Sequence, residues 1–342
     1  MTKRLAVFGV GAIGGSIGGF LTKAGVPVTL IDMWPANVEA IRSKGLKVTT
    51  LEDEFTVHPK ALHLSDVSAA RQQWDVVFLA VKSYDTLWSV KFIEPYLAPG
   101  GLIVSAQNSI NDEAIAELVG WSRVIGCVVT FGAGMYEPGH VEYTTPTGRT
   151  AFTVGEPGGL ITARLTELAE TMNKGRATKT TANLWGERWS KLATNSMANA
   201  LAGITGLKSG ELRTNDQTRR LSIRVAAELV QVGTTLGVPI TPITGIEPQM
   251  FVKALKDGGA MEEVEGKLVE FAKQIGVGRP SLAQDMMKGR KVEVDYLNGY
   301  VVRRGKEVGV ATPVNEAIVR LCKRVEAGEL KPGLSNLSQI PQ

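Results

Sequence analysis

The first half of the chain alternates short, almost continuously apolar runs with segments of helical periodicity. The apolar runs cover residues 4–10, 27–32, 75–81, 101–107 and 123–131. Runs of this length and composition are typical of parallel strands that helices cover on both faces. The pattern therefore predicts βαβ units on a parallel sheet, which is an α/β fold.

Two later segments alternate apolar and polar residues instead. They are GHVEYTTP at residues 139–146 and RTAFTVGEP at residues 149–157, and both contain turn residues. Alternation of this kind is typical of antiparallel strands with one covered face. We expect both segments to extend and close the parallel sheet.

The second half carries helical periodicity almost throughout. The predicted helices cover residues 183–204, 216–236, 248–275 with interruptions, 280–288, 292–308 and 313–326. Thr312 and Pro313 read as the N-cap and the first position of the last helix. Residues 173–183 are polar and read as a linker. We expect an N-terminal domain over residues 1–178, an all-α domain over 183–330, and a flexible tail over 331–342.

Composition narrows the class of protein. The 342 residues are 44% hydrophobic and 21% charged, which is ordinary for a globular chain with two domains. The formal charge of +4 is spread along the chain and favours small anions over nucleic acid. Cys127 and Cys322 stand in no disulfide or metal-binding spacing, and no apolar run reaches the roughly 18 residues that span a bilayer. We expect a cytoplasmic protein without a metal site.

A glycine-rich segment, GVGAIG, follows the first predicted strand and begins a helical pattern. In that context its first glycine permits a tight turn, its second lets a pyrophosphate approach the backbone, and its third lets the helix pack closely on the strand. The helix N-terminus also offers free N–H groups to phosphates. The alternative is a strand-to-helix turn without a ligand. The segment predicts a Rossmann-type domain whose dinucleotide-binding residues are Gly9, Val10, Gly11, Ala12, Ile13 and Gly14.

Asp32 ends the second predicted strand, 23 positions after Gly9. An acid at about this offset hydrogen-bonds the adenosine ribose and repels a 2′-phosphate, which favours NAD over NADP. NADP stays an alternative because Arg42 and Lys44 follow and could soften the repulsion. Asp32 could also serve only as a turn or helix-cap acid.

The segment KLATNSMANALAG places three polar residues in an otherwise apolar helical pattern. Lys191, Asn195 and Asn199 are four residues apart, so on one continuous helix they share a stripe about 12 Å long. A solvated face is the alternative, but the remaining residues leave little room for a second, water-facing side. Buried polar groups need partners, so the stripe predicts a ligand site. Burial would also lower the pKa of Lys191 and suit it as a proton donor.

A second polar cluster lies between residues 279 and 317. Glu293 stands in an apolar run and needs a partner, and Asp285 and Asn298 need partners for the same reason. For each of the three, a structural salt bridge or cap is an equally good interpretation.

Together these residues resemble the ketopantoate reductase family (2-dehydropantoate 2-reductase). The resemblance runs from Gly9 to about Arg324 and rests on GVGAIGG, LAVKSYDT, QNSIND, KLATNSMAN and PSLAQDMMKGRKVEVDYLNG. It implies a Rossmann domain followed by a helical domain like the C-terminal domain of 6-phosphogluconate dehydrogenase, with the active site between them. The implied reaction is the NAD(P)H-dependent reduction of a 2-oxo acid, above all of 2-dehydropantoate to (R)-pantoate in pantothenate biosynthesis.

The resemblance also implies roles for individual residues. Lys191 would be the general acid, and Glu293, the second catalytic residue, would hold a substrate hydroxyl or the cofactor side. Lys82 and Asn108 would flank the nicotinamide end of the cofactor. The substrate would be bound by Asn195, Asn199, Ser209 and Ser281.

The sequence departs from the family pattern at several points. Asp32 stands where the family often has an arginine suited to NADPH, and Ser109 replaces the usual glycine of QNG. Residues 239–268 also form a longer segment than family members need. These departures favour NAD and leave room for a related 2-oxo acid as the substrate.

Other functions stay open at this point. One is a dehydrogenase of the same fold that acts on another hydroxy or oxo acid in catabolism, and another is a non-catalytic dinucleotide sensor. A 3-hydroxyacyl-CoA dehydrogenase is less favoured because the helical half contains no histidine. The expected partners are a small 2-oxo acid and a second copy of the chain, with no nucleic acid and no membrane.

Overall fold

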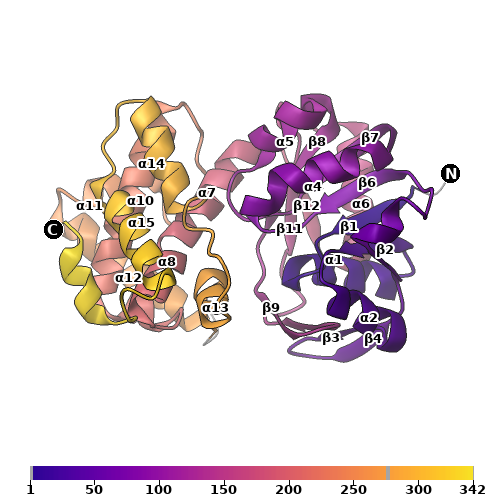
Figure 1. Ribbon diagram of the computed structural model, residues 1–342. Helices are drawn as coiled ribbons and strands as arrows, with labels where there is room; N and C mark the ends of the chain where they lie inside the picture. The colour runs from indigo at the N-terminus through magenta and orange to yellow at the C-terminus, as the bar shows by residue number, and fades with distance from the viewer. Residues whose placement is uncertain (1–2, 275–277, 342) are drawn as a thin grey trace. The chain divides into compact units, whose positions relative to one another are not determined.

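The computed structural model describes residues 3–274 and 278–341 and divides into two compact units. Unit 1 is Met1–Leu184 and unit 2 is Trp185–Gln342. Figure 1 shows unit 1 as a sheet with helices on both faces and unit 2 as a group of helices. The α/β and all-α classes predicted from the two halves are therefore confirmed.

Unit 1 is built on an eight-stranded sheet. Its strands in spatial order are β12 (Thr178–Thr181), β11 (Phe152–Gly155), β8 (Val124–Val129), β7 (Leu97–Ser105), β6 (Trp74–Leu79), β1 (Leu5–Phe8), β2 (Val28–Asp32) and β5 (Lys60–His63). All neighbouring pairs are parallel except β8 and β11. The five apolar runs of the sequence are β1, β2, β6, β7 and β8, which occupy the middle of the sheet.

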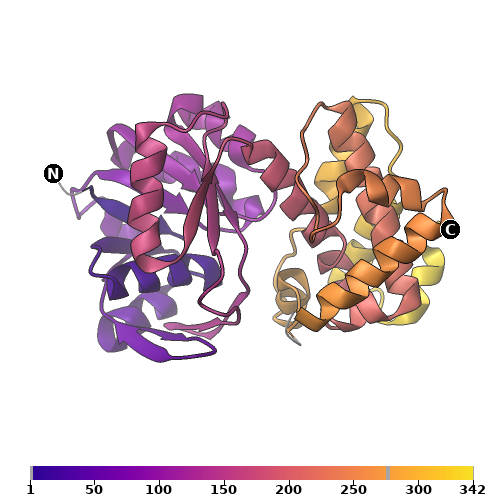
Figure 2. The same ribbon diagram turned by 180° about the vertical axis from the view of Figure 1, so that it is seen from behind.

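Alternate residues of the central strands enter two separate cores. Leu5 and Val7 pack on the face that carries α1 and α6, whereas Ala6 and Phe8 pack on the face that carries α4 and α5. Figure 1 shows α4 and α5 in front of the sheet, and Figure 2 shows α6 in front of its other face. The helices of unit 1 are α1 (Ala12–Lys23), α2 (Pro35–Lys44), α3 (Leu64–Val67), α4 (Thr86–Ile93), α5 (Asp112–Val119) and α6 (Ala163–Gly175), with 3₁₀ turns η1 (Ser83–Asp85), η2 (Glu94–Tyr96) and η3 (Trp121–Arg123).

A second, four-stranded sheet lies beside α1. Its order is β4 (Glu54–Val57), β3 (Leu46–Thr49), β10 (His140–Tyr143) and β9 (Ala133–Glu137). The prediction that residues 139–146 extend the main sheet was therefore wrong, because β10 pairs in parallel with β3, some 90 residues earlier. Residues 149–157 do extend the main sheet, since β11 pairs antiparallel with β8.

Unit 2 is helical over most of its described length. Its helices are α7 (Leu184–Ser196), which begins at the last residue of unit 1, α8 (Asn199–Thr205), α9 (Glu211–Thr214), α10 (Asp216–Thr235), α11 (Pro248–Ala254), α12 (Gly258–Gln274), α13 (Ser281–Met287), α14 (Asn298–Glu307) and α15 (Pro313–Glu326), followed by the 3₁₀ turn η4 (Leu334–Gln339). Ile275, the predicted end of one helix, lies outside the described residues. Within the described residues, no helix combines the length and the apolar character needed to cross a membrane.

Two predicted helices are interrupted or shorter. The helix predicted over residues 183–204 breaks at Met197 and Ala198, where Ala198 has a backbone of φ −125° and ψ −45°. The carbonyl of Ser196 at this break accepts a hydrogen bond from the side chain of Asn298 (3.3 Å). The helix predicted over 292–308 begins only at Asn298, because the backbone of Leu297 is not helical (φ −99°, ψ −98°).

A buried carboxylate caps α15. Thr312 occupies the N-cap position as predicted, but its side chain makes no capping hydrogen bond. Instead the carboxylate of Glu228, on α10, accepts from the backbone N–H groups of Val314 (2.9 Å) and Asn315 (3.0 Å) and from the Asn315 side chain (2.7 Å). Burial raises the pKa of Glu228, and these donors oppose the rise.

We expect Glu228→Ala to lower the free energy of unfolding by about 2–3 kcal/mol, because it leaves three buried donors without their charged acceptor. Thr312→Ala is the matched control and should cost only about 1 kcal/mol, since it removes one buried methyl group and no capping hydrogen bond. Chemical denaturation of both variants measures the difference. Equal losses would contradict the assignment of the cap to Glu228.

The segment after residue 331, predicted to be a flexible tail, packs on unit 2. The Asn336 side chain donates to the carbonyl of Ile204 (3.0 Å), and the backbone N–H of Gly333 donates to the same carbonyl (3.0 Å). Leu337 and Ile340 are buried. The polar composition of the segment did not indicate this packing, because only one buried asparagine and two apolar side chains hold the segment in place.

Candidate functional site

Four predicted cofactor residues follow the carboxyl ends of neighbouring strands in unit 1. Gly9 follows β1, Asp32 ends β2, Lys82 follows β6 and Asn108 follows β7. These strands are adjacent and parallel, so the four positions lie along one edge of the sheet. The chain leaves β1 toward β2 on one side and later returns to β6 on the other, which makes this edge a topological switch point. Crevices at such points are the usual ligand sites of open α/β sheets.

The glycine segment forms a tight turn from β1 into α1. Gly9 has φ +92°, a left-handed conformation that favours glycine, and its N–H donates to the carbonyl of Ile31 (2.9 Å). A Cβ on Gly14 would overlap the carbonyl oxygen of Gly9, so only glycine lets the helix approach the turn this closely. Gly11 is the N-cap of α1 and contributes no side-chain cap. The first turn of α1, which includes Ala12 and Ile13, can therefore offer its N–H groups to an anion.

Asp32 is tied to the glycine turn through hydrogen bonds. The Asn37 side chain donates to Asp32 Oδ2 (2.7 Å) and to the carbonyl of Val10 (2.9 Å). Trp34 N–H donates to Asp32 Oδ1 (3.2 Å). Only 8% of Asp32 is exposed, and burial raises its pKa against the opposing effect of these donors. Asn37 therefore orients the carboxylate, a positioning role that the sequence pattern did not indicate.

The segments that carry Lys82 and Asn108 are bonded to each other. Lys82 is the N-cap residue of η1, and the hydroxyl of Ser83 donates to the carbonyl of Asn108 (3.4 Å). The Asn111 side chain donates to the same carbonyl (2.9 Å). Ser109 is buried with φ +69°. A serine in this conformation carries backbone strain that glycine would not.

In unit 2, Lys191 and Asn195 lie one turn apart on α7. Desolvation lowers the pKa of Lys191 to about 8. Asn195 is 8% exposed. The predicted side-by-side arrangement holds for these two residues because α7 is continuous between them.

Asn199 lies on a different helix from Lys191. It is 5% exposed and is the first residue of α8, beyond the break at residues 197–198. The single stripe predicted for all three polar residues was therefore wrong for Asn199. The break is not visible in the pattern, because it depends on the hydrogen bond between Asn298 and Ser196, some 100 residues apart.

The segments that carry Ser209 and Ser281 meet beside α8. Ser209 N–H donates to the carbonyl of Gly278 (3.1 Å), and the Arg279 guanidinium donates to the carbonyl of Gly206 (2.6 Å). Ser281 is the first residue of α13, whose Leu282 and Met286 lie directly against Gly203 of α8. Unit 2 thus brings the segments of Asn199, Ser209 and Ser281 into one region.

Glu293 lies on a turn before α14. It is 5% exposed, and its carbonyl accepts from the N–H groups of Tyr296 (2.9 Å) and Leu297 (3.1 Å). The turn leads into Asn298, whose side chain bridges Ser196 and Asn315. Asn298 thus has a structural role, and it ties the Glu293 turn to the end of α7. Across residues 3–274 and 278–341, no group of three or more His, Cys, Asp or Glu side chains could hold a metal ion.

Comparisons with known proteins match both halves of the chain. A family model described as "Ketopantoate reductase PanE/ApbA" matches residues 5–157, and one described as "Ketopantoate reductase PanE/ApbA C terminal" matches residues 183–326. The 2-dehydropantoate 2-reductase of Aquifex aeolicus is 31% identical over 97% of this chain and 99% of its own. The enzyme of the same name from Pyrococcus horikoshii is 30% identical over 95% and 98%.

Solved structures with similar folds include a member of the same family and a dehydrogenase of another name. A PanE/ApbA family ketopantoate reductase from Ralstonia eutropha JMP134 is 30% identical, with a TM-score of 0.79 over 95% of this chain and 99% of that one. A D-mandelate dehydrogenase, solved with NADH and anilino(oxo)acetate, has a TM-score of 0.82 over 95% and 99% at 23% identity. The fold is therefore shared by enzymes with different named substrates.

Proposed function

The chain belongs to the ketopantoate reductase family, and from this premise we propose that it reduces 2-dehydropantoate to (R)-pantoate with NADH. Membership of the family makes the protein an oxidoreductase that acts on a CH–OH group. The proposed substrate follows the name shared by relatives at 30–31% identity over nearly the whole chain. The observation that carries the proposal is Lys191, a desolvated lysine with a pKa of about 8 one helical turn from a buried asparagine.

The proposed roles follow from side-chain chemistry. A lysine with a pKa near the working pH is protonated at neutral pH and can donate its proton to a developing alkoxide. Asn195 and Asn199 offer amide groups that both donate and accept hydrogen bonds, which suits a substrate carrying a carboxylate and a hydroxyl. Ser209 and Ser281 would add hydroxyl donors, and the carboxylate of Glu293 would accept from a substrate hydroxyl.

The residues of unit 1 fit a dinucleotide. Gly11 leaves the start of α1 uncapped by a side chain, which suits a pyrophosphate. Asp32, oriented by Asn37, would accept from the ribose hydroxyls, and Lys82 and Asn108 would lie toward the nicotinamide end. A reduced nicotinamide, when bound, supplies the hydride.

The preference for NADH rests on Asp32. Its buried carboxylate would face the position that a 2′-phosphate occupies in NADPH, and two negative charges in a partly desolvated site repel each other. NADPH stays the alternative. Arg42, one of the two cations that could offset this repulsion, is already paired with Asp66 (2.6 Å) and Glu39 (3.0 Å).

A panel of reactions tests the substrate and the cofactor together. We expect kcat/KM for 2-dehydropantoate to exceed that for pyruvate, 2-oxoisovalerate and phenylglyoxylate. We also expect kcat/KM with NADH to exceed kcat/KM with NADPH by at least about tenfold, which is about 1.4 kcal/mol. Absence of turnover with 2-dehydropantoate but turnover with another member of the panel would favour the second candidate, a dehydrogenase of another hydroxy or oxo acid. Strain at Ser109, a departure from the family pattern, is the observation that favours this candidate.

The pH dependence should follow the protonation of Lys191. As a general acid the lysine must carry its proton, so kcat/KM for reduction should be level below pH 8 and fall tenfold per pH unit above it. In the oxidation direction the same group accepts a proton, so the rate should instead rise up to about pH 8 and then level off. Steady-state rates in both directions measure this, and profiles of the same shape in both directions would contradict the role.

The assembly and location remain predictions. A family member from Staphylococcus aureus is described as dimeric, and we propose a homodimer here as well. Cys127 and Cys322 are buried thiols rather than disulfide partners, which is compatible with the proposed cytoplasmic location.

A further inference from the structure

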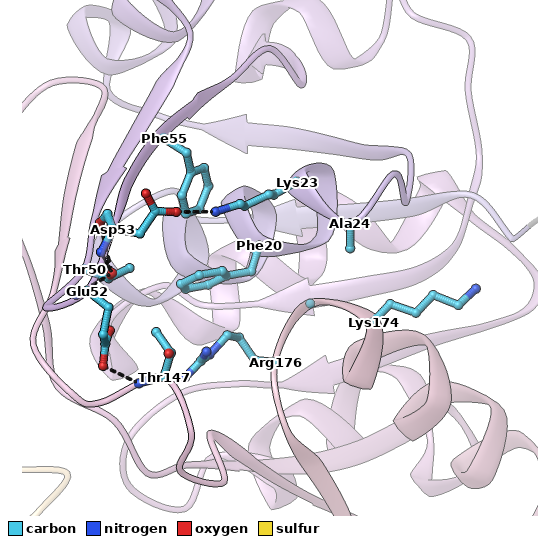
Figure 3. A pocket seen from close by; sticks show the side chains of 11 residues that line it. Phe20, Lys23, Ala24, Thr50, Glu52, Asp53, Phe55, Thr147, Lys174 and Arg176 are labelled. Atoms are coloured by element: carbon cyan, nitrogen blue, oxygen red, sulfur yellow. Dashed lines mark hydrogen bonds and ion pairs between the residues drawn. The ribbon is translucent and has the colours of Figure 1, made fainter.

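A cavity of about 350 Å³ lies in unit 1 at the far end of α1 from the glycine turn. The glycine turn precedes Ala12, whereas the cavity contacts Phe20, Lys23 and Ala24 at the C-terminal end of the same helix. Figure 3 shows the side chains that line it, which also come from the β3–β4 turn and from the end of α6. The cavity is therefore separate from the dinucleotide residues.

A buried cation lines this cavity. Arg176 is 8% exposed, and its guanidinium lies over the rings of Phe20 and Tyr143, 5.0 Å from each centroid. Its Nη2 donates to the Tyr143 hydroxyl (3.2 Å), while its Nε has no hydrogen-bond partner. Among the residues that the structure describes, no carboxylate forms an ion pair with it.

Neither carboxylate that lines the cavity, Glu52 or Asp53, forms an ion pair with Arg176. Lys23 pairs with Asp53 (2.7 Å) and lies over the Phe55 ring (4.0 Å). Glu52 accepts from the backbone N–H of Thr147 (3.1 Å). Figure 3 shows the Lys23–Asp53 and Glu52–Thr147 contacts as dashed lines.

A buried guanidinium without a counter-ion is unfavourable. Aromatic faces recover part of the lost hydration, but an oxyanion recovers much more through charge-assisted hydrogen bonds. The cavity offers such an anion a route to Arg176, because Arg176 is one of its lining residues. An anion in the cavity would supply the counter-charge for Arg176.

The remaining walls select the kind of anion. The rings of Phe20 and Phe55 lie 5.5 Å apart in the wall of the cavity; Phe20 is only 7% exposed, so the half-buried Phe55 supplies most of the apolar surface. The exposed carboxylate of Glu52 lies at the same cavity and disfavours a doubly charged ligand. We propose that this cavity binds a small monocarboxylate with an aromatic or other apolar body, its carboxylate pairing with Arg176 and its body packing on Phe20 and Phe55.

Titration of the isotope-labelled full chain with benzoate tests the site. The backbone amides of Ala24, Thr147 and Gly175 should shift along one saturable curve, while the amide of Gly11 reports separately on the glycine turn. Acetate should bind at least about fivefold more weakly, because it lacks the apolar ring whose burial would favour binding. Inorganic phosphate should give no saturable shift at the three amides.

Two variants separate the site from general effects on the surface. Arg176→Met should weaken benzoate binding at least about tenfold, through loss of the charged donor. Ala24→Phe keeps the charge but fills the cavity, and it should weaken binding to the same extent even if Arg176→Met does not fold. Lys91→Met, a change of an exposed cation on α4, is the control and should leave the affinity unchanged.

Three results would each overturn the proposal. The first is no saturable shift with benzoate. The second is native affinity in Ala24→Phe, or in a folded Arg176→Met. The third is binding of phosphate as tight as that of benzoate, which would remove the assignment to a monocarboxylate.

Discussion

Replacing Lys191 by alanine is expected to lower the turnover of 2-dehydropantoate at least 100-fold, the low end for the loss of a general acid. Reduction of a ketone places negative charge on its oxygen, and a positioned ammonium that donates a proton stabilises that charge. Lys191 suits this role because desolvation brings its pKa to about 8, so it is protonated at neutral pH yet gives up its proton readily. Steady-state kinetics at pH 7 measures the loss.

Binding measurements distinguish this loss from a loss of structure. Lys191→Ala should bind NADH, followed by its fluorescence, within about twofold of the native protein, since the proposed role lies in the chemical step. Lys256→Ala, which removes an exposed lysine of the same unit, should leave both turnover and binding unchanged. Native turnover in Lys191→Ala would remove the proposed acid, whereas NADH binding without any turnover in the native protein would support the alternative of a non-catalytic dinucleotide sensor.

Gly14→Ala is expected to destabilise unit 1 by about 3 kcal/mol or more, because the new methyl group would overlap the backbone carbonyl of Gly9. Backbone cannot move aside as the end of a flexible side chain can, so α1 would have to shift away from β1. The turn that carries the proposed pyrophosphate site would shift with it. Chemical denaturation measures the stability, and NADH fluorescence measures the binding.

Gly11→Ala is the matched comparison within the same turn. Gly11 has φ −79°, and a Cβ at this position meets nothing within 4 Å, so the variant should lose less than about 0.5 kcal/mol of stability. Its methyl group would nevertheless occupy the space through which a pyrophosphate approaches, and NADH affinity should fall at least about tenfold, or about 1.4 kcal/mol. Native affinity in Gly11→Ala would contradict the proposed phosphate site.

The features that could be predicted from the sequence are those set by local pattern. The five central strands are continuous apolar runs, and α10 and α15 begin and end within one residue of their predicted bounds because their periodicity is uninterrupted. The glycine turn was recognisable because two of its glycines meet local backbone requirements: Gly9 has a positive φ, and Gly14 lies against the carbonyl of Gly9. The position of Asp32 followed from the end of β2.

The features that could not be predicted depend on contacts between distant segments. The pairing of β10 with β3 joins short strands that carry no signal of their partner. The Glu228 cap and the Asn298 bond to Ser196 each join residues about 85 to 100 positions apart. Asn199 consequently starts a new helix instead of continuing a stripe. The proposed substrate residues are thus individually visible in the sequence, but their arrangement is set by buried polar contacts.

The docking of Asn336 and Gly333 on Ile204 also constrains the order in which the protein can form during synthesis. Ile204 lies in the helix that Asn199 begins, and its carbonyl finds these two donors only within the last ten residues of the chain. Unit 1 contains all the strands of its own sheets and can complete them while the ribosome is still translating unit 2. Unit 2 acquires these hydrogen bonds only after residues 333–336 have been made, so a chain that stalls before them would carry a finished sheet domain and an unfinished helical one.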